Sequence, residues 1–242
     1  MNDCNYLDIN AGIGGFAYGA YLAGFKCKNH FFFESREFDK NIYKKRFPGA
    51  VEFADLSIIS TLKLKKDYGE QWVITITGSL NAGNRENLWF EPFRIIRGLL
   101  PKYIIIEDVP TILNSWLSAV VRDFAKIGYS VEWQDLRARD FGAAHKRQRI
   151  WLVAYPNGQR LEGRPKAVQE TKQKQSGQFN ARYYWKEACS DGRNRIWGSN
   201  SDVPRVAHGV SDRVDRIKSI GNAIVPQIAA FLFRLCENGF RK

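Results

Sequence analysis

Residues Tyr6–Phe16, with the sequence YLDINAGIGGF, decide the fold of this chain. The apolar run Tyr6–Ile9 predicts a short buried strand, and the glycines after it predict a tight turn before a helix over Phe16–Ala23. Glycines at such a turn let the backbone pass close to a ligand, and a helix N-terminus offers free N–H groups there. Taken alone, the stretch also fits a strand–turn–helix unit that binds nothing.

The alternation of strand and helix continues over the first two thirds of the sequence. The run Lys102–Ile106 is nearly all β-branched, which indicates a strand buried on both faces. An alternating order of this kind predicts an α/β domain with a mostly parallel sheet and helices on both faces. The expected strands after the first are Asn29–Phe33, Val51–Phe53, Trp72–Thr77, Lys102–Ile106, Ser130–Leu136 and Ile150–Ala154, and the expected helices are Phe38–Phe47, Asn87–Leu100 and Ile112–Ile127.

The composition changes at Tyr155-Pro156 and indicates three parts. Residues 1–155 form the α/β domain, residues 156–204 a small insert with little core of its own, and residues 205–242 a C-terminal segment that returns to the domain. From Pro156 to Trp197 there are nine Lys and Arg against four Asp and Glu, a net charge of +5. Ile217–Phe240 has a helical pattern behind a Gly-Asn turn.

The totals exclude several classes of protein. With 44% hydrophobic residues the chain is globular, and no apolar run approaches the length that spans a bilayer. Its four cysteines (Cys4, Cys27, Cys189 and Cys236) form no C-x-x-C pair, so we expect reduced thiols, a cytoplasmic protein and no metal site. A net charge of +12 favours polyanionic partners, although charge alone leaves a merely basic soluble protein equally open.

An acidic residue follows the glycine turn at a characteristic distance. Glu34 ends the second expected strand, 20 residues after Gly14, where a carboxylate can accept both hydroxyls of a ribose. The turn reads Gly12-x-Gly14-Gly15 and lacks the third glycine of the dinucleotide fingerprint. S-adenosylmethionine (SAM) therefore fits better than NAD.

Charged side chains stand at the ends of two later strands. Glu107 and Asp108 end a buried strand, where a half-buried carboxyl can hold its proton near neutral pH and donate it. A simple helix cap is the alternative, above all for Asp108. Arg147 and Arg149 alternate with Gln148, so they can share one face and hold a phosphate or a base carbonyl. A solvated basic hairpin is the alternative for them.

Taken in order, these segments resemble the cytosine-C5 DNA methyltransferase family in its phage and prophage form, over nearly the whole chain. The resemblance implies a Rossmann-like methyltransferase fold and the Glu107-Asp108-Val109 and Arg147-x-Arg149 elements of its catalytic site. The basic insert falls where the family carries its target recognition domain. The residues that the resemblance assigns to the cofactor are Asp8, Gly12, Ile13, Gly14, Gly15, Phe16, Glu34, Asp55, Leu56, Asn222, Ala223 and Ile224.

The resemblance also implies a reaction and its setting. A target cytosine is flipped out of duplex DNA, a cysteine thiolate attacks C6, Glu107 binds and protonates N3, and C5 takes a methyl group from SAM. Double-stranded DNA is the expected partner, and no membrane is expected. The expected setting is restriction-modification or a prophage, in the cytoplasm of a bacterial or phage-infected cell, and we expect a monomer.

One segment of the family pattern is absent. In the family the fourth strand ends in Gly-x-Pro-Cys-Gln, and that cysteine is the nucleophile. Here Thr77-Gly78 runs directly into Ser79-Leu80-Asn81-Ala82-Gly83, which resembles the start of the following mobile loop. Ser79 is a poor substitute, because an alcohol is far less ionised than a thiol at pH 7. We therefore expect an inactive or impaired enzyme.

Two alternatives remain open from the sequence. The chain can be a non-catalytic DNA-binding protein that acts as a partner or competitor of an intact methyltransferase, as its charge of +12 and its retained arginines favour. A different modification of a base in the same pocket is the other. The family pattern is also altered at Asn10, where a Phe usually contacts adenine, and at Ser35 and Asp108.

Overall fold

A computed structural model describes residues 4–78, 85–114, 116–159 and 212–239. The seven strands are β1 (Asn5–Ile9), β2 (Asn29–Phe33), β3 (Val51–Glu52), β4 (Trp72–Thr77), β5 (Tyr103–Asp108), β6 (Tyr129–Arg137) and β7 (Gln148–Pro156). The α-helices are α1 (Gly15–Leu22), α2 (Glu37–Arg46), α3 (Thr61–Tyr68), α4 (Arg85–Leu99), α5 (Leu117–Lys126), α7 (Arg213–Asn222) and α8 (Pro226–Gly239). Two 3₁₀ helices, η1 (Pro110–Asn114) and η2 (Ala138–Phe141), complete the described elements.

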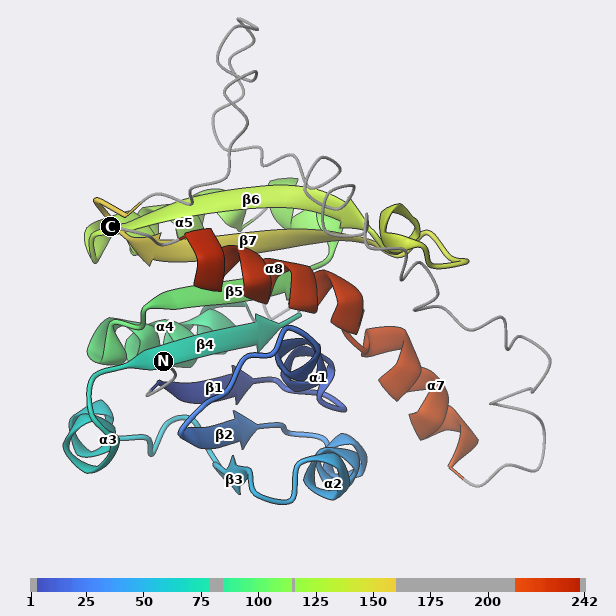
Figure 1. Cartoon of the computed structure of the whole chain (residues 1–242), viewed down its shortest axis with the longest axis horizontal. Coiled ribbons are helices and arrows are strands. Elements are labelled where there is room, and N and C mark those ends of the chain that lie inside the picture. Colours follow the sequence, from blue (N-terminus) through green and yellow to red (C-terminus); the bar gives the residue numbers. More distant parts are fainter. Residues whose placement is uncertain (1–3, 79–84, 115, 160–211, 240–242) are drawn as a thin grey trace, which may run out of the picture.

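The strands form one sheet in the order β3-β2-β1-β4-β5-β7-β6. The first five are parallel to their neighbours, whereas β7 runs antiparallel to both β5 and β6. The chain moves outward from β1 to β2 and β3, then returns to place β4 on the other side of β1 (Figure 1). This reversal creates a switch point between β1 and β4, and open α/β sheets bind ligands at the carboxyl ends of the strands beside such a point.

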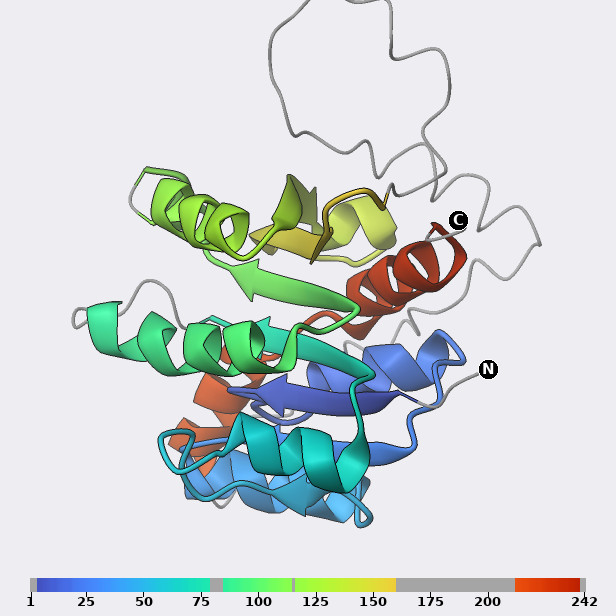
Figure 2. The ribbon, with the colours of Figure 1, turned by 90° about the vertical axis from the view of Figure 1, so that its left-hand side faces the viewer.

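Each face of the sheet carries its own core. Alternate residues of the central strands, such as Tyr6 and Tyr103, pack with α1 and α8 on one face. Their neighbours, such as Leu7 and Ile104, pack with α3, α4 and α5 on the other. Figure 2 shows the sheet edge-on between the green helices α4 and α5 and the blue and red helices α1 and α8. Side chains on both faces are buried because helices cover both, which confirms the α/β prediction.

The predicted helices differ from the observed ones at three places. The helix expected over Ile112–Ile127 is divided between η1 and α5. Helix α3 was not expected, although the Ser60 hydroxyl accepts a hydrogen bond from the backbone N–H of Lys63 as an N-cap. The helical pattern expected over Ile217–Phe240 is divided between α7 and α8, because Pro226 restricts the residue before it and favours the first position of a new helix.

The C-terminal helices also bear on the membrane prediction. By length and composition, Val214–Asn238 passes the criteria for a membrane span, contrary to the expectation that no run approaches that length. Of its most apolar part 61% is buried inside the protein, and the segment contains nearly all of both α7 and α8 with the break between them. This is the burial pattern of a core helix.

The two ends of the described chain meet where α8 packs on α1. A methyl group at Gly19 would lie 2.5 Å from Cβ of Ala229 and 2.8 Å from the carbonyl oxygen of Pro226. The missing side chain therefore sets the distance between the two helices. The expected insert over 156–204 lies almost wholly outside the described residues, and so does the segment from Ser79 to Gly83.

We predict that Gly19→Ala lowers the free energy of unfolding by about 1–2 kcal/mol, because overpacking outweighs the gain in helix propensity. Urea denaturation measures the change. Gly49→Ala is the matched control, since no atom lies within 4 Å of the added methyl group there. Equal stability of the two variants would contradict the α1–α8 contact.

Candidate functional site

The glycine turn after β1 is closely packed at Gly14 and Gly15 and open at Gly12. A methyl group at Gly14 would lie 2.5 Å from Cε2 of Phe47, and one at Gly15 would lie 2.6 Å from Cβ of Ile224. Gly12 has a φ of 54° with no atom within 4 Å of its missing side chain. Asn10 has a φ of 53°, a region that Asn tolerates better than Phe does. The open position at Gly12 leaves space for a ligand against the backbone.

Glu34 is oriented by the backbone around it. Its Oε2 accepts a hydrogen bond from the N–H of Gly12 at 2.7 Å, and its Oε1 accepts one from the N–H of Arg36 at 2.8 Å. The carboxylate is thus fixed at the end of β2, beside the open position of the turn. Oε1 also accepts a long hydrogen bond from the Ser35 hydroxyl at 3.5 Å, whereas Oε2 has a second lone pair for a ligand hydroxyl.

Asp8 lies inside the molecule, below the turn. Its Oδ1 accepts a hydrogen bond from the Thr75 hydroxyl at 2.8 Å, and its Oδ2 accepts one from Tyr43 at 3.2 Å. The residue is fully buried, and burial raises the pKa of its carboxyl to about 7. In this arrangement Asp8 ties β1 to β4 and α2 and presents no atom to the surface of the turn. Phe16 is equally buried, edge-on to Trp151.

The loop after β3 is held by an arginine that no sequence motif marks. Arg94 on α4 donates hydrogen bonds to the carbonyls of Leu56 at 2.7 Å, Ser57 at 3.4 Å and Ile59 at 2.9 Å. Leu56 is buried, whereas Asp55 is exposed and accepts a hydrogen bond from the N–H of Ser57 at 2.8 Å. This clamp, formed by the Arg94 side chain, fixes Asp55 and Leu56, two of the predicted cofactor residues, at the carboxyl edge of the sheet.

The C-terminal segment reaches the same edge. Ile224 is buried against Gly15, so the sequence Asn222-Ala223-Ile224 lies beside the start of α1. Asn222 is exposed, and the carbonyl of the preceding Gly221 accepts a hydrogen bond from Nη1 of Arg147 at 2.5 Å. The fold thus brings these three residues to the glycine turn, from more than 200 residues further along the chain.

Glu107 forms the centre of a second cluster at this edge. It is only 2% exposed, and its Oε1 lies 3.2 Å from Nε of Arg149 and 3.7 Å from Nη2 of Arg147. Neither contact meets the geometry of a hydrogen bond, so that oxygen has no hydrogen-bond partner among the described residues. Both arginines lie near the same oxygen of Glu107, although Arg147 precedes β7 and adopts a φ of 24°, so the strand alternation from which the shared face was predicted does not include Arg147.

Burial controls the protonation of Glu107. Removal from water raises the pKa of its carboxyl to about 7, against the opposing effect of the two arginines. Burial also lowers the pKa of Arg147, although Glu107 opposes that change. A carboxyl that titrates near neutral pH can donate or accept a proton under physiological conditions, as general acid catalysis requires. Asp108 is buried beside it and accepts a hydrogen bond from the N–H of Val109 at 2.7 Å.

The described cysteines lie at the opposite edge. Cys4 and Cys27 directly precede β1 and β2, and Cys236 packs in the same core as Cys4, near the Lys102–Glu237 ion pair at the start of β5. At about 3.3 Å per residue, β1 alone separates Cys4 from the glycine turn by roughly 16 Å. Burial raises the pKa of the Cys4 thiol to about 11 and also raises that of Cys27. None of the three is a thiolate near Glu107, and Cys189 lies outside the described residues.

Residues 4–197 match the family model described as C-5 cytosine-specific DNA methylase. Among curated proteins, the type II methyltransferase M.Sau3AI of Staphylococcus aureus is 28% identical over 185 residues, which cover 64% of this chain and 44% of that protein. M.HaeII of Haemophilus aegyptius is 29% identical over 167 residues, covering 64% and 51%. The chain therefore spans about half the length of these relatives.

Solved structures share the fold. A structure from E. coli, described as a DNA modification methyltransferase encoded within a prophage, gives a TM-score of 0.54 at 21% identity and covers 63% of this chain and 47% of that one. A methyltransferase from Entamoeba histolytica gives 0.61 at 14% identity and covers 100% of both chains. At these identities the likeness concerns the fold alone.

We predict that the ionisation of Glu107 and Asp8 lowers the stability of the protein as the pH rises from 4.5 to 7, against the opposite effect of His30, whose pKa burial lowers to about 4. Glu107 and Asp8 have ordinary pKa values of 4.5 and 3.8 and titrate near 7 in the folded state, so folding is favoured while they hold their protons. The variant Glu107→Gln cannot ionise at this position, so it should lose less stability than the wild type as the pH rises.

Between pH 5 and pH 8, the free energy of unfolding of Glu107→Gln should therefore rise relative to that of the wild type by about 1–3 kcal/mol. Urea denaturation at both pH values measures it, with the exposed Glu70→Gln as control; a constant difference would contradict the burial of an ionisable Glu107.

We predict that Arg94→Met loosens residues 55–59, because three backbone carbonyls lose a charged donor. The free energy of unfolding should fall by about 1–3 kcal/mol, and amide hydrogen exchange in that loop should accelerate about tenfold or more. Arg97→Met is the matched control, since Arg97 is exposed on the same helix. Equal exchange in the two variants would show that the loop does not depend on the clamp.

Proposed function

The chain belongs to the C-5 cytosine-specific DNA methylase family, and from this membership we propose that it binds duplex DNA and SAM but lacks the thiol needed for efficient methyl transfer. The proposal rests on one juxtaposition. Glu107, Arg147 and Arg149 are assembled at the carboxyl edge of β5 and β7, whereas the sequence contains no cysteine between Cys27 and Cys189.

The residues at the switch point fit a methyl donor of this type. The oriented carboxylate of Glu34 suits the two hydroxyls of a ribose, and the open backbone at Gly12 admits the part of the ligand next to it. Asp55 and Leu56 would lie on the adenine side, with Asn222 and Ala223 at the other end. When bound, SAM supplies an electrophilic methyl group.

The second cluster suits a flipped pyrimidine. A protonated Glu107 would donate to N3 of the ring, and its near-neutral pKa allows it to hold that proton at pH 7. Arg149 and Arg147 would supply positive charge beside the carbonyl oxygen of the base and beside a phosphate. Such contacts bind and polarise a cytosine, but C5 stays a poor nucleophile until a second group adds to C6.

The absent thiol decides the expected rate. In a serine protease, loss of the nucleophile lowers kcat on the order of a million-fold. The cysteines of the described residues have raised pKa values at the far edge of the sheet, so they offer no replacement. We therefore assign the chain the binding functions of its family and, at most, a trace of its chemistry.

A second candidate function follows from the charge. A net charge of +12 with a DNA-type site favours a non-catalytic protein that assists or competes with an intact methyltransferase at shared sequences. Since the similar curated proteins include type II methyltransferases of bacteria, a restriction-modification or prophage setting in the cytoplasm suits either candidate.

We predict that duplex DNA containing 5-fluorocytosine forms no denaturant-stable adduct with this protein in the presence of SAM. The fluorinated base traps the covalent intermediate of an active family member, and an intact relative serves as the positive control. A shifted band on a denaturing gel, with a mass equal to protein plus DNA, would prove that a nucleophile exists and would defeat the proposal.

We predict that SAM still binds, as measured by calorimetry, and that Glu34→Gln weakens it at least tenfold because the charged acceptor of the ribose is lost. Glu70→Gln carries the same change of charge at an exposed position and should leave the affinity unchanged. Absence of any SAM binding by the wild-type protein would remove the cofactor part of the proposal.

A further inference from the structure

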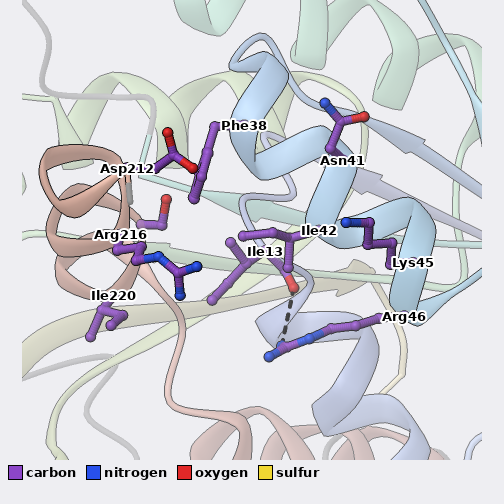
Figure 3. Close-up of a pocket in the computed structure, with 10 residues that line it drawn as sticks. Ile13, Phe38, Asn41, Ile42, Lys45, Arg46, Asp212, Arg216 and Ile220 are labelled. Atoms are coloured by element: carbon purple, nitrogen blue, oxygen red, sulfur yellow. Dashed lines mark hydrogen bonds between the residues drawn. The ribbon is translucent and has the colours of Figure 1, made fainter. Parts of the chain in front are cut away.

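A groove of about 620 Å³ lies between α2 and α7, beside the predicted cofactor cradle, with which it shares Ile13 (Figure 3). Its volume lies within the range of small-molecule sites, which is about 300–1,000 Å³. Ile13 of the glycine turn lies at its floor, and both helices contribute the walls. The lining residues are Ile13, Phe38, Asn41, Ile42, Lys45, Arg46, Asp212, Arg216, Ser219 and Ile220.

The two walls are held together by polar contacts. Arg36 bridges Asp39 at 2.8 Å and Asp215 at 3.1 Å, which links α2 to α7. The hydroxyl of Ser219 donates to the buried carboxylate of Asp39 between the same helices. Arg46 donates to the carbonyl of Ile13 at 3.3 Å, which joins the floor to α2. The groove is therefore a formed feature of the fold rather than a gap between independent segments.

The groove combines positive charge with apolar surface. Lys45, Arg46 and Arg216 stand against a single carboxylate, Asp212, so the lining carries a net charge of +2. Within the described ranges, neither Lys45 nor Arg46 makes an ion pair with a carboxylate. Ile220 is 52% exposed, with Phe38 and Ile42 half-buried across from it. A ligand that fits must carry negative charge and a ring or sugar that covers the apolar side chains.

We propose that this groove binds a nucleotide unit of the DNA strand that flanks the target base, with the phosphate on Lys45 and Arg216 and the sugar on Ile220. The inference rests on the proposed DNA-binding function and adds a second contact site to it. From Arg216 and Asp212, α7 leads to Gly221, whose carbonyl is bound by Arg147 beside Glu107. At 1.5 Å per residue these five to nine residues span about 8–14 Å, or about two to four steps of B-DNA at 3.4 Å.

Charge also decides between a DNA strand and a segment of this chain. Residues 160–211 contain ten Lys and Arg against five Asp and Glu, a net charge of +5. A segment of that charge is repelled by a groove of the same sign, whereas each DNA phosphate is attracted to it. A phosphate strand is therefore the favoured occupant.

The test is lysine acetylation footprinting of the wild-type protein with and without a 16-base-pair duplex. We expect the duplex to slow acetylation of Lys45 at least fivefold. Lys63 and Lys66, exposed on α3, are the internal controls and should change less than twofold. A gel shift with Lys45 unprotected would show that duplex DNA binds elsewhere, which would overturn the proposed groove contact and leave the proposed function intact. No shift at low salt would overturn both.

Two double variants complete the test. Lys45→Gln with Arg216→Gln should lower the slope of log affinity against log salt concentration by about 2 and weaken duplex binding tenfold or more. Lys63→Gln with Lys66→Gln removes the same charge and should change neither, and thermal midpoints check that both variants fold. Equal behaviour of the two variants would overturn the proposal. So would protection of Lys45 by millimolar inorganic phosphate or AMP that equals protection by the duplex, because the groove would then bind a free anion.

Discussion

Two glycines of α1, Gly15 and Gly19, leave the space into which the C-terminal segment packs. Ile224 fills the space beside Gly15, and Ala229 fills the space beside Gly19, so a chain that left the sheet at β7 returns to the start of α1. This contact fixes the position of α7 along the carboxyl edge together with the contacts of Arg36 with Asp215 and of Ser219 with Asp39. The position of α7 in turn places the carbonyl of Gly221 on Arg147 and closes the groove against α2. A close approach of two helices thus controls both proposed binding sites.

The same face of the sheet carries two buried carboxyl groups, Asp8 and Glu107, with different partners. Asp8 accepts hydrogen bonds from two hydroxyls, whereas Glu107 has two arginines nearby and an acceptor oxygen without a hydrogen bond. Burial raises the pKa of both carboxyls to about 7. The satisfied group is structural, because its bonds join three elements. The unsatisfied group is the one that can exchange a proton with a ligand, since an incompletely paired buried group is costly until a partner arrives.

Most of the sheet could be predicted from the sequence, because buried parallel strands such as Asn29–Phe33 and Trp72–Thr77 are apolar runs that end at turn residues. The positions of Glu34, Glu107 and Ile224 at one edge follow from the same alternation. Arg94 could not be found in this way, since its carbonyl partners lie 35 to 38 residues earlier and carbonyls leave no mark in a sequence. Asp8 was assigned to the cofactor, but its role depends on Thr75 and Tyr43, which tertiary packing alone brings to it. The groove likewise depends on a pairing of α2 with α7 that no local pattern predicts.

The residues of the proposed binding sites and the position of the family nucleophile lie on different segments of the fold. Glu107 belongs to β5, and Arg147 and Arg149 come from β7 and the residue before it, so their geometry depends on the pairing of β5 with β7. The cofactor cradle depends on β1, β2 and the C-terminal segment. Between β4 and α4 the chain has only residues 78–84, and the family nucleophile belongs to that connection. Residues 78–84 contain no cysteine, and the backbone hydrogen bond from Gly78 to the carbonyl of Glu107, at 2.8 Å, fixes the end of β4. The proposed loss of the reaction therefore does not require loss of either proposed binding site, because the residues of these sites lie on other connections.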